Sequence, residues 1–204
     1  QIYRIAEPTV DLARTDQQLT VADAERIELS YEGGKVFDCE ALLVDPQSGE
    51  LLMITKDIFA GPSYVFRAPP IAAPLGPVVL TSVRDCQHAP LALSFPDREH
   101  PAVTGADISA AGDAIIVRAY SGIFLWNRLK GESIGAALGR EPCPLPAAAE
   151  PQGEAVGFSP DPGDHAVGLQ SIDQRRDIAV ADEQFTRQLP HPHRLPAAIE
   201  RRQR

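Results

Sequence analysis

The sequence contains no run of about 18 apolar residues, the length that a membrane-spanning helix requires. It also has no basic-then-apolar leader at its N-terminus. Positive charge is scarce, since 19 Lys and Arg residues face 28 Asp and Glu residues and leave a formal net charge of −9. A chain of this sign gains little by displacing counterions from phosphates, so we expect neither nucleic acid nor an anionic membrane surface among its partners.

Cysteine is also scarce, and the three residues, Cys39, Cys86 and Cys143, cannot all pair within one chain. No two of them are close enough to form the C-x-x-C motif of a metal or redox site. We therefore predict scattered, partly buried thiols. The alternative is a single disulfide in an exported protein, either Cys39–Cys143 or Cys39–Cys86.

Chain-breaking residues are abundant instead, with 19 Pro and 15 Gly in a chain of 204 residues. They leave few uninterrupted stretches in which a long helix could form. A hydrophobic content of 44% and a charged content of 23% are ordinary for a globular protein. The composition therefore favours short strands joined by turns.

Three segments of the chain, at 40–55, 104–118 and 154–161, can be laid over one another. Each begins with a short apolar strand and continues into a turn. In the first two segments a second strand-like stretch follows, at Leu51–Thr55 and Ala114–Arg118. This pattern predicts two β-hairpins and the start of a third.

The turns of these hairpins begin at Asp45, Ser109 and Ser159, which are 64 and then 50 residues apart. Asp or Ser at such a position bonds to the backbone two residues on, and Gly at the end of the turn supplies a positive φ. A four-stranded repeat unit of a propeller takes about 40–50 residues. The surplus in the first interval lies in Asp85–Val103, which we expect to be a solvated loop.

Further strand-like pieces follow each hairpin. Tyr64–Arg67 and Gly122–Trp126 fall at equivalent places and are predicted to be third strands. Val78–Val83 and Pro142–Leu145 are predicted to be fourth strands, and Arg26–Tyr31 is predicted to be the fourth strand of a unit ahead of the first repeat.

The three repeated segments resemble those of a known family. Val103–Val117, with Ala106-Asp-Ile-Ser-Ala-Ala-Gly-Asp113, and Gly157-Phe-Ser-Pro-Asp161 resemble the D-x-S-P-D-G blade hairpin of TolB-like and WD40-like bacterial β-propellers. Asp38–Gly49 and Gln152–Val156 are similar to the start of the innermost blade strand in bacterial propeller proteins. The resemblance covers about residues 20–161, although Ala110-Ala111 replaces the Pro-Asp pair in the second repeat.

The resemblance implies an all-β fold, a partial β-propeller of about two to three four-stranded antiparallel blades. We expect this domain at residues 1–161 and an irregular or disordered tail at 162–204, where the repeat pattern stops. The chain would then be a fragment of a larger propeller. The same resemblance favours an exported or periplasmic protein.

The start of each innermost strand is the main candidate site. In a propeller these positions, here Glu40, Thr104 and Glu154, form a ring beside the central channel, with Asp38 and Asp107 nearby. Converging carboxylates repel one another unless a cation or a base satisfies them, so one hypothesis is a metal site for Ca²⁺ built from Glu40, Glu154, Asp38 and Asp107. The alternative is that these side chains accept hydrogen bonds from backbone N–H groups of the adjoining blade.

Gly131-Glu-Ser133-Ile-Gly135 matches the G-x-S-x-G pattern of a hydrolase nucleophile elbow. That elbow belongs to a parallel α/β sheet, and this sequence has no alternating β–α pattern. A nucleophilic serine also needs a base, and His165 is the only histidine soon after it. We therefore predict a polar connection with a one-turn helix at this place.

The remaining histidines carry weaker signals. His191-Pro-His193 brings two imidazoles together, but no third ligand is near, so we expect an exposed tail rather than a metal site. His88 and His100 flank the long loop, which can bind ligands at a propeller face but is more typical of a solvated segment.

Taken together, these features favour a non-catalytic scaffold or binding module that presents its loops to a protein or small-molecule ligand. The alternative is a divalent-cation-dependent propeller hydrolase of the lactonase or phytase-like type, with Ca²⁺ held through Glu40 and Glu154. A partial propeller would also expose blade edges and an apolar blade face, so we expect self-association.

Overall fold

A computed structural model describes residues 1–158 except 12, 15–16, 60, 69, 71–76, 85–87, 96–101 and 148–152. Within these residues the chain forms eleven strands, one short α-helix and one 3-10 turn, so the all-β prediction is confirmed. No helix in this part of the chain is long and apolar enough to cross a membrane. The predicted tail at 162–204 lies outside the described residues.

The first large sheet has five strands in the order β3-β7-β6-β5-β4. Its meander runs through β4 (Asp38–Val44), β5 (Leu51–Lys56), β6 (Val65–Ala68) and β7 (Val78–Ser82), each antiparallel to the next. β3 (Leu29–Tyr31) pairs with β7 in parallel at the outer edge. Every meander strand overlaps a stretch that the sequence predicts to be a strand, and the ends differ by one or two residues.

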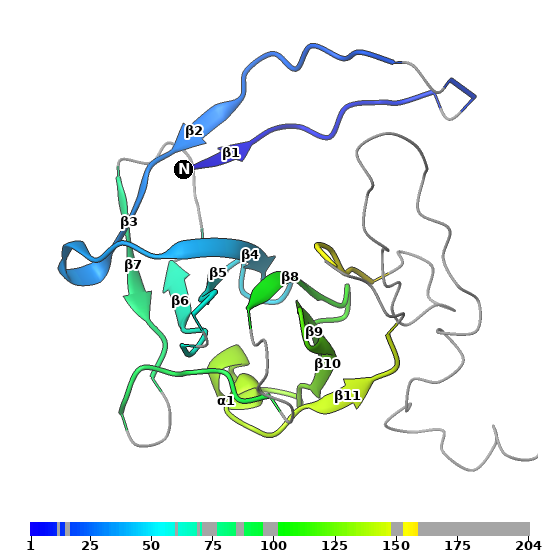
Figure 1. The fold of residues 1–204 in the computed structure, drawn as a ribbon. Helices are drawn as coiled ribbons and strands as arrows, with labels where there is room; N and C mark the ends of the chain where they lie inside the picture. Colours follow the sequence, from blue (N-terminus) through cyan, green and yellow to red (C-terminus); the bar gives the residue numbers. More distant parts are fainter. Residues whose placement is uncertain are drawn as a thin grey trace, which may run out of the picture.

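The second sheet has four strands in the order β11-β10-β9-β8. Its strands are β8 (Val103–Ile108), β9 (Ala114–Ala119), β10 (Gly122–Asn127) and β11 (Cys143–Leu145), again an antiparallel meander. The helix α1 (Ile134–Leu138) lies in the connection between β10 and β11. Figure 1 shows that β4 and β8, the first strands of the two meanders, are neighbours.

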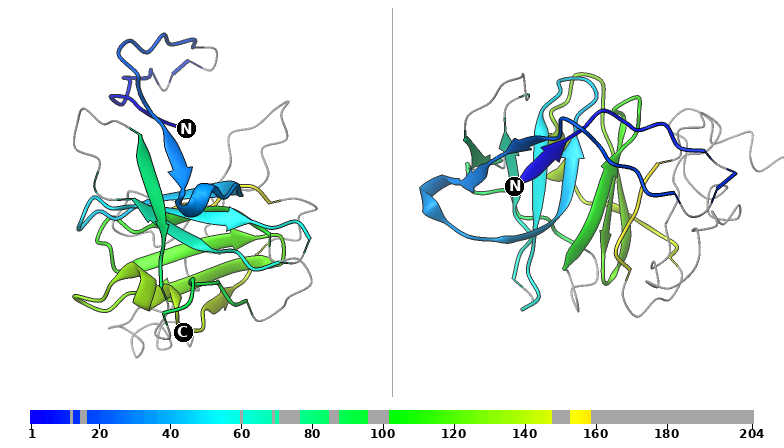
Figure 2. Two further views of the ribbon diagram at one scale, coloured as in Figure 1. Left: turned by 90° about the vertical axis from the view of Figure 1, so that its left-hand side faces the viewer. Right: turned by 90° about the horizontal axis from the view of Figure 1, so that it is seen from above.

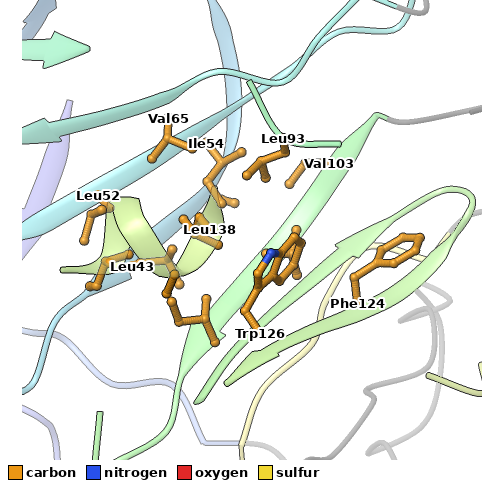
Figure 3. Close-up of a cluster of buried hydrophobic side chains, with 14 of the residues drawn as sticks. Leu43, Leu52, Ile54, Val65, Leu93, Val103, Phe124, Trp126 and Leu138 are labelled. Atoms are coloured by element: carbon orange, nitrogen blue, oxygen red, sulfur yellow. The ribbon is translucent and has the colours of Figure 1, made fainter. Parts of the chain in front are cut away.

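The main hydrophobic core lies between the two sheets, which stack on one another in Figure 2. Alternate residues of β4 and β5, including Leu43, Leu52 and Ile54, face Trp126 and other side chains of the second sheet (Figure 3). Leu138 from α1 fills the same core. Burial alternates along β4, whereas β5, β9 and β10 are largely buried on both faces, and the apolar side chains between the sheets hold the two meanders together.

The long segment after β7 also contributes to this core. Leu91, Leu93 and Phe95 are buried, and backbone hydrogen bonds join Leu91 to β6 and Leu93 to Ser63. The expectation of a solvated loop at Asp85–Val103 is therefore wrong for this portion, because its alternating apolar residues form a further edge beside β6.

The hairpins β4–β5 and β8–β9 have the same register. Every pair of the second hairpin repeats a pair of the first with 64 added to both residue numbers, the separation of Lys56 and Tyr120. Each first strand also carries a β-bulge, at Glu40 in β4 and at Thr104 in β8. The alignment of the first two segments in the sequence thus corresponds to equal backbone geometry.

The N-terminal region differs from the sequence prediction. Arg26–Tyr31 is not one strand: β2 (Glu25–Ile27) pairs with β1 (Ile2–Arg4), and β3 joins the five-stranded sheet. A 3-10 turn follows, in which Gly33 has a φ of 70° that favours glycine and lets the chain reverse into β4. β1, β2 and the ribbon between them form an N-terminal arm, residues 1–27.

Candidate functional site

The bulged ends of β4 and β8 hold a group of paired polar side chains. The Lys56 Nζ atom donates hydrogen bonds to Glu40 Oε2 at 2.8 Å and to the Tyr120 hydroxyl at 3.0 Å. The Lys56 side chain is only 7% exposed. Burial alone would lower the pKa of Lys56, but its hydrogen bonds and the charge of Glu40 outweigh this and raise the pKa above its ordinary value.

The positions of these groups follow from the backbone. A β-bulge re-aims the side chain of the extra residue, and here it directs Glu40 toward the end of β5, where Lys56 lies. Thr104, at the equivalent bulge of β8, donates from Oγ1 to the carbonyl of Gly153 at 2.6 Å. The first bulge residue thus pairs within its own hairpin, whereas the second joins its hairpin to the segment at Gly153.

Asp107 connects β8 to the start of the third repeat. Its Oδ2 accepts a hydrogen bond from the backbone N–H of Phe158 at 2.8 Å, and its Oδ1 accepts one from Ile108. This arrangement corresponds to the alternative stated for the candidate ring, in which an acid binds backbone N–H groups of an adjoining segment. The carboxylate acts here as an acceptor that fixes one strand beside another.

The predicted metal ligands occupy different surroundings. Asp38 and Glu154 are exposed, Glu40 is paired with Lys56, and Asp107 is bonded to backbone. In the described part of the chain, no three His, Cys, Asp or Glu side chains lie together in a way that could hold a metal ion. The Ca²⁺ hypothesis therefore stays a prediction, and the described residues bring no ligand set together for it.

The opposite end of the two sheets is joined by a buried ion pair that the sequence analysis did not find. Asp45 is 2% exposed, and its carboxylate accepts hydrogen bonds from Arg128 Nη1 at 2.9 Å and from Arg128 Nη2 at 3.3 Å. Ser48 and the backbone N–H of Gln47 complete its shell. Burial opposes ionisation, but these donors outweigh it and lower the pKa of Asp45.

The same end carries a direct contact between the two hairpin turns. Gln47 Nε2 donates to the carbonyl of Ala111 at 3.0 Å, and Arg128 also donates to the carbonyl of Gly112 at 3.3 Å. The sequence identified Asp45 only as a turn residue. Nothing local marks Arg128 as its partner, because the two are 83 residues apart.

The G-x-S-x-G segment forms a helix cap. Ser133 is the N-cap of α1, and its Oγ accepts a hydrogen bond from the N–H of Ala136 at 3.1 Å. The prediction of a polar connection with a short helix is confirmed. His165, the only base considered for this serine, lies outside the described residues.

Two of the cysteines are free thiols, so a Cys39–Cys143 disulfide is not formed. The Cys39 thiol lies near the carbonyls of Ala41 and Ile54, and burial raises its pKa. Because Cys39 is a free thiol, it forms no disulfide with Cys86 either. Cys86 itself lies outside the described residues.

Of the histidine hypotheses, only His88 can be examined. It is exposed, lies in a bend of the chain and has a left-handed φ of 63°. His100, His191 and His193 lie outside the described residues.

No family model, curated protein or solved structure matches this chain. The resemblance to bacterial propellers therefore depends on the motifs of the sequence alone.

Proposed function

We propose that the chain is a non-catalytic scaffold or binding module of the β-propeller type, in which the two meanders are neighbouring blades. The observation that carries this proposal is the contact between equivalent parts of the two hairpins at both ends. Lys56 meets Tyr120, its equivalent 64 residues on, and the turn at Gln47 meets the turn at Ala111. In a β-propeller, blades of the same structure are arranged around a central axis with their first strands adjacent. The two meanders have the same register, and their first strands, β4 and β8, are adjacent.

The chemistry at the bulged ends supports binding rather than catalysis. A lysine that acts as a nucleophile or base needs a lowered pKa, whereas the pKa of Lys56 is raised by its hydrogen bonds and by Glu40. Ser133, which lies between β10 and β11, accepts a hydrogen bond as the N-cap of α1, so its hydroxyl oxygen serves the helix. Groups that are already paired and held by a rigid scaffold are suited to orienting a ligand.

The ligand is a polar protein segment or small molecule that carries positive charge. Asp38, which pairs with Lys56 across β4 and β5, is exposed beside the paired group. Glu154 is exposed beside Gly105 of β8, and the chain as a whole carries a net charge of −9. Such a surface concentrates cationic partners through its field. Loops and strand ends on a rigid sheet scaffold are common positions for binding residues.

Calorimetry with Ca²⁺ separates the binding module from the alternative of a cation-dependent hydrolase. We expect no saturable heat on titration of the wild-type chain, and the same result for Glu154→Gln. Saturable Ca²⁺ uptake that is lost in Glu154→Gln and in Glu40→Gln would establish the cation site and contradict the proposal.

Selection from a random phage-displayed peptide library tests the location of the binding surface. We expect the selected peptides to be basic and to lose most of their binding to an Asp38→Ala/Glu154→Ala variant. Glu141→Ala is the control of like charge, because Glu141 is an exposed carboxylate next to Arg140, which bonds to Asn127 at the other end of the sheets. Peptides that bind all three proteins equally would place the binding surface elsewhere.

A further inference from the structure

The turn between β5 and β6 presents two neighbouring apolar side chains to solvent. Ile58 is 63% exposed and Phe59 is 89% exposed. Single exposed apolar side chains are ordinary on a protein surface. Two in succession on one turn form a larger apolar surface, which we call the apolar tip.

Asp57 fixes the shape of this turn. Its Oδ1 accepts a hydrogen bond from the backbone N–H of Phe59 at 2.7 Å. Gly61 lies so close to the Asp57 carboxylate that a Cβ atom there would overlap it. An Asp side chain that bonds to the backbone two residues on holds a turn in one conformation. A pre-ordered turn loses little conformational entropy when a partner covers it, so more of the contact energy is available as affinity.

The apolar tip lies beside the acidic end of the candidate site. Asp38, the first residue of β4, is exposed and pairs with Lys56, the last residue of β5. Phe59 follows Lys56 by three residues, so their Cα atoms are at most about 11 Å apart. An extended peptide covers that distance in about three residues. One short segment can therefore reach Asp38 and the apolar tip together.

The charge around the apolar tip is negative. The ammonium group of Lys56 lies 2.8 Å from the Glu40 carboxylate, so these two charges offset each other. Asp38 and Asp57 add two negative charges, and Lys35, three positions before Asp38, adds one positive charge. The surface beside the apolar tip is therefore acidic, as is the chain as a whole.

We propose that the partner at this end of the molecule is a short protein segment in which basic and apolar side chains lie within about three residues of each other. This inference rests on the binding function proposed above and adds that Phe59 anchors the ligand. The basic side chains of the segment meet Asp38 and Asp57, and its apolar side chains cover Ile58 and Phe59. The covered aromatic ring supplies affinity, whereas the opposite charges orient the segment.

The size and charge of this surface favour such a segment over other partners. An aromatic side chain buries about 150–250 Å², whereas a stable interface between folded proteins buries about 800 Å² on each side. The apolar tip therefore suits a short segment that binds weakly. A second copy docked through the same tip would bring acidic residues of both copies together, and an anionic lipid surface would face the same acids, so like charges oppose both.

Peptides selected from a random phage-displayed library on the wild-type chain test this inference, with fluorescence anisotropy of the synthesised peptides as the measurement. We expect the peptides to combine basic and apolar residues. Phe59→Ser should raise their Kd at least about tenfold, because aromatic anchors carry much of the binding energy of an interface. Asp38→Ala should also raise the Kd, and high salt should reduce this effect but not the effect of Phe59→Ser, since salt screens only the charge contacts.

Leu129→Ser is the matched control. Leu129 is a 67% exposed apolar residue in the connection after β10, next to Arg128, which bonds to Asp45 at the other end of the sheets. We expect this variant to bind the peptides as the wild type does. Circular dichroism should show all three variants folded, because each replaces an exposed side chain.

The possible results separate this inference from the function on which it rests. Peptides that lose affinity with Asp38→Ala but keep it with Phe59→Ser would overturn the inference and leave the proposed binding function standing. Peptides that respond to neither substitution would overturn both. Equal loss with Phe59→Ser and Leu129→Ser would also overturn the inference. So would a wild-type dimer in sedimentation equilibrium, or binding to phosphatidylcholine vesicles, that Phe59→Ser abolishes, because the occupant would then be a second copy or a lipid surface.

Discussion

The buried pair between Asp45 and Arg128 allows a quantitative prediction. Replacing Arg128 by Met keeps most of its aliphatic length but leaves the Asp45 carboxylate 2% exposed and without its cationic partner. Breaking a buried ion pair from one side costs about 3–5 kcal/mol. Because Asp45 keeps hydrogen bonds from Ser48 and Gln47, we expect the low end, about 3 kcal/mol. That is a large part of the 5–15 kcal/mol that is usual for a domain.

Urea unfolding followed by tryptophan fluorescence measures this effect. Trp126 is the only tryptophan and is 2% exposed in the core between the sheets, so its emission reports their separation. The matched control is Arg26→Met, which removes an arginine from the exposed pair with Glu28. Exposed pairs contribute at most about 1 kcal/mol, so the control should unfold close to the wild type.

The pH dependence provides an independent check. The pKa of Asp45 is lowered in the folded chain, so its pair contributes stability above the unfolded-state pKa of about 4 and loses it as the pH falls through the folded value. The difference between wild type and Arg128→Met should therefore be largest near neutral pH and shrink in acid. In the double variant Arg128→Met/Asp45→Asn, part of the loss should be recovered. If Arg128→Met is no less stable than Arg26→Met, the reasoning is refuted.

Three further predictions concern single positions. Thr104→Val removes the hydrogen bond that joins β8 to the third repeat, and urea unfolding should show a loss of about 1–3 kcal/mol. Gly112→Ala should lower stability more than Gly131→Ala in the same assay, since both residues have a positive φ but only Gly112 has a neighbour against its missing Cβ. Cys143 is exposed whereas burial raises the pKa of Cys39, so mass spectrometry should show iodoacetamide modifying Cys143 before Cys39. Equal unfolding midpoints, or faster labelling of Cys39, would contradict these expectations.

The sequence predicts the local elements well, because strands and turns leave local patterns. The repeated strand–turn–strand pattern located both hairpins, and Asp45 and Ser109 do begin their turns, as their hydrogen bonds to nearby backbone show. The serine of the G-x-S-x-G segment was expected beside a short helix and caps one. The candidate residues Glu40 and Thr104 were placed at equivalent positions, and both occupy bulges.

Only the tertiary structure shows how these elements meet. Residues 26–31 read as one strand, yet two short strands enter different sheets, because pairing partners far along the chain decide where a strand goes. The partners of Glu40 and Asp45 were likewise not readable: Lys56 is brought close by strand pairing and Arg128 by the stacking of two sheets. A local pattern specifies what a segment can form, whereas burial and pairing between distant segments select what its charged side chains touch.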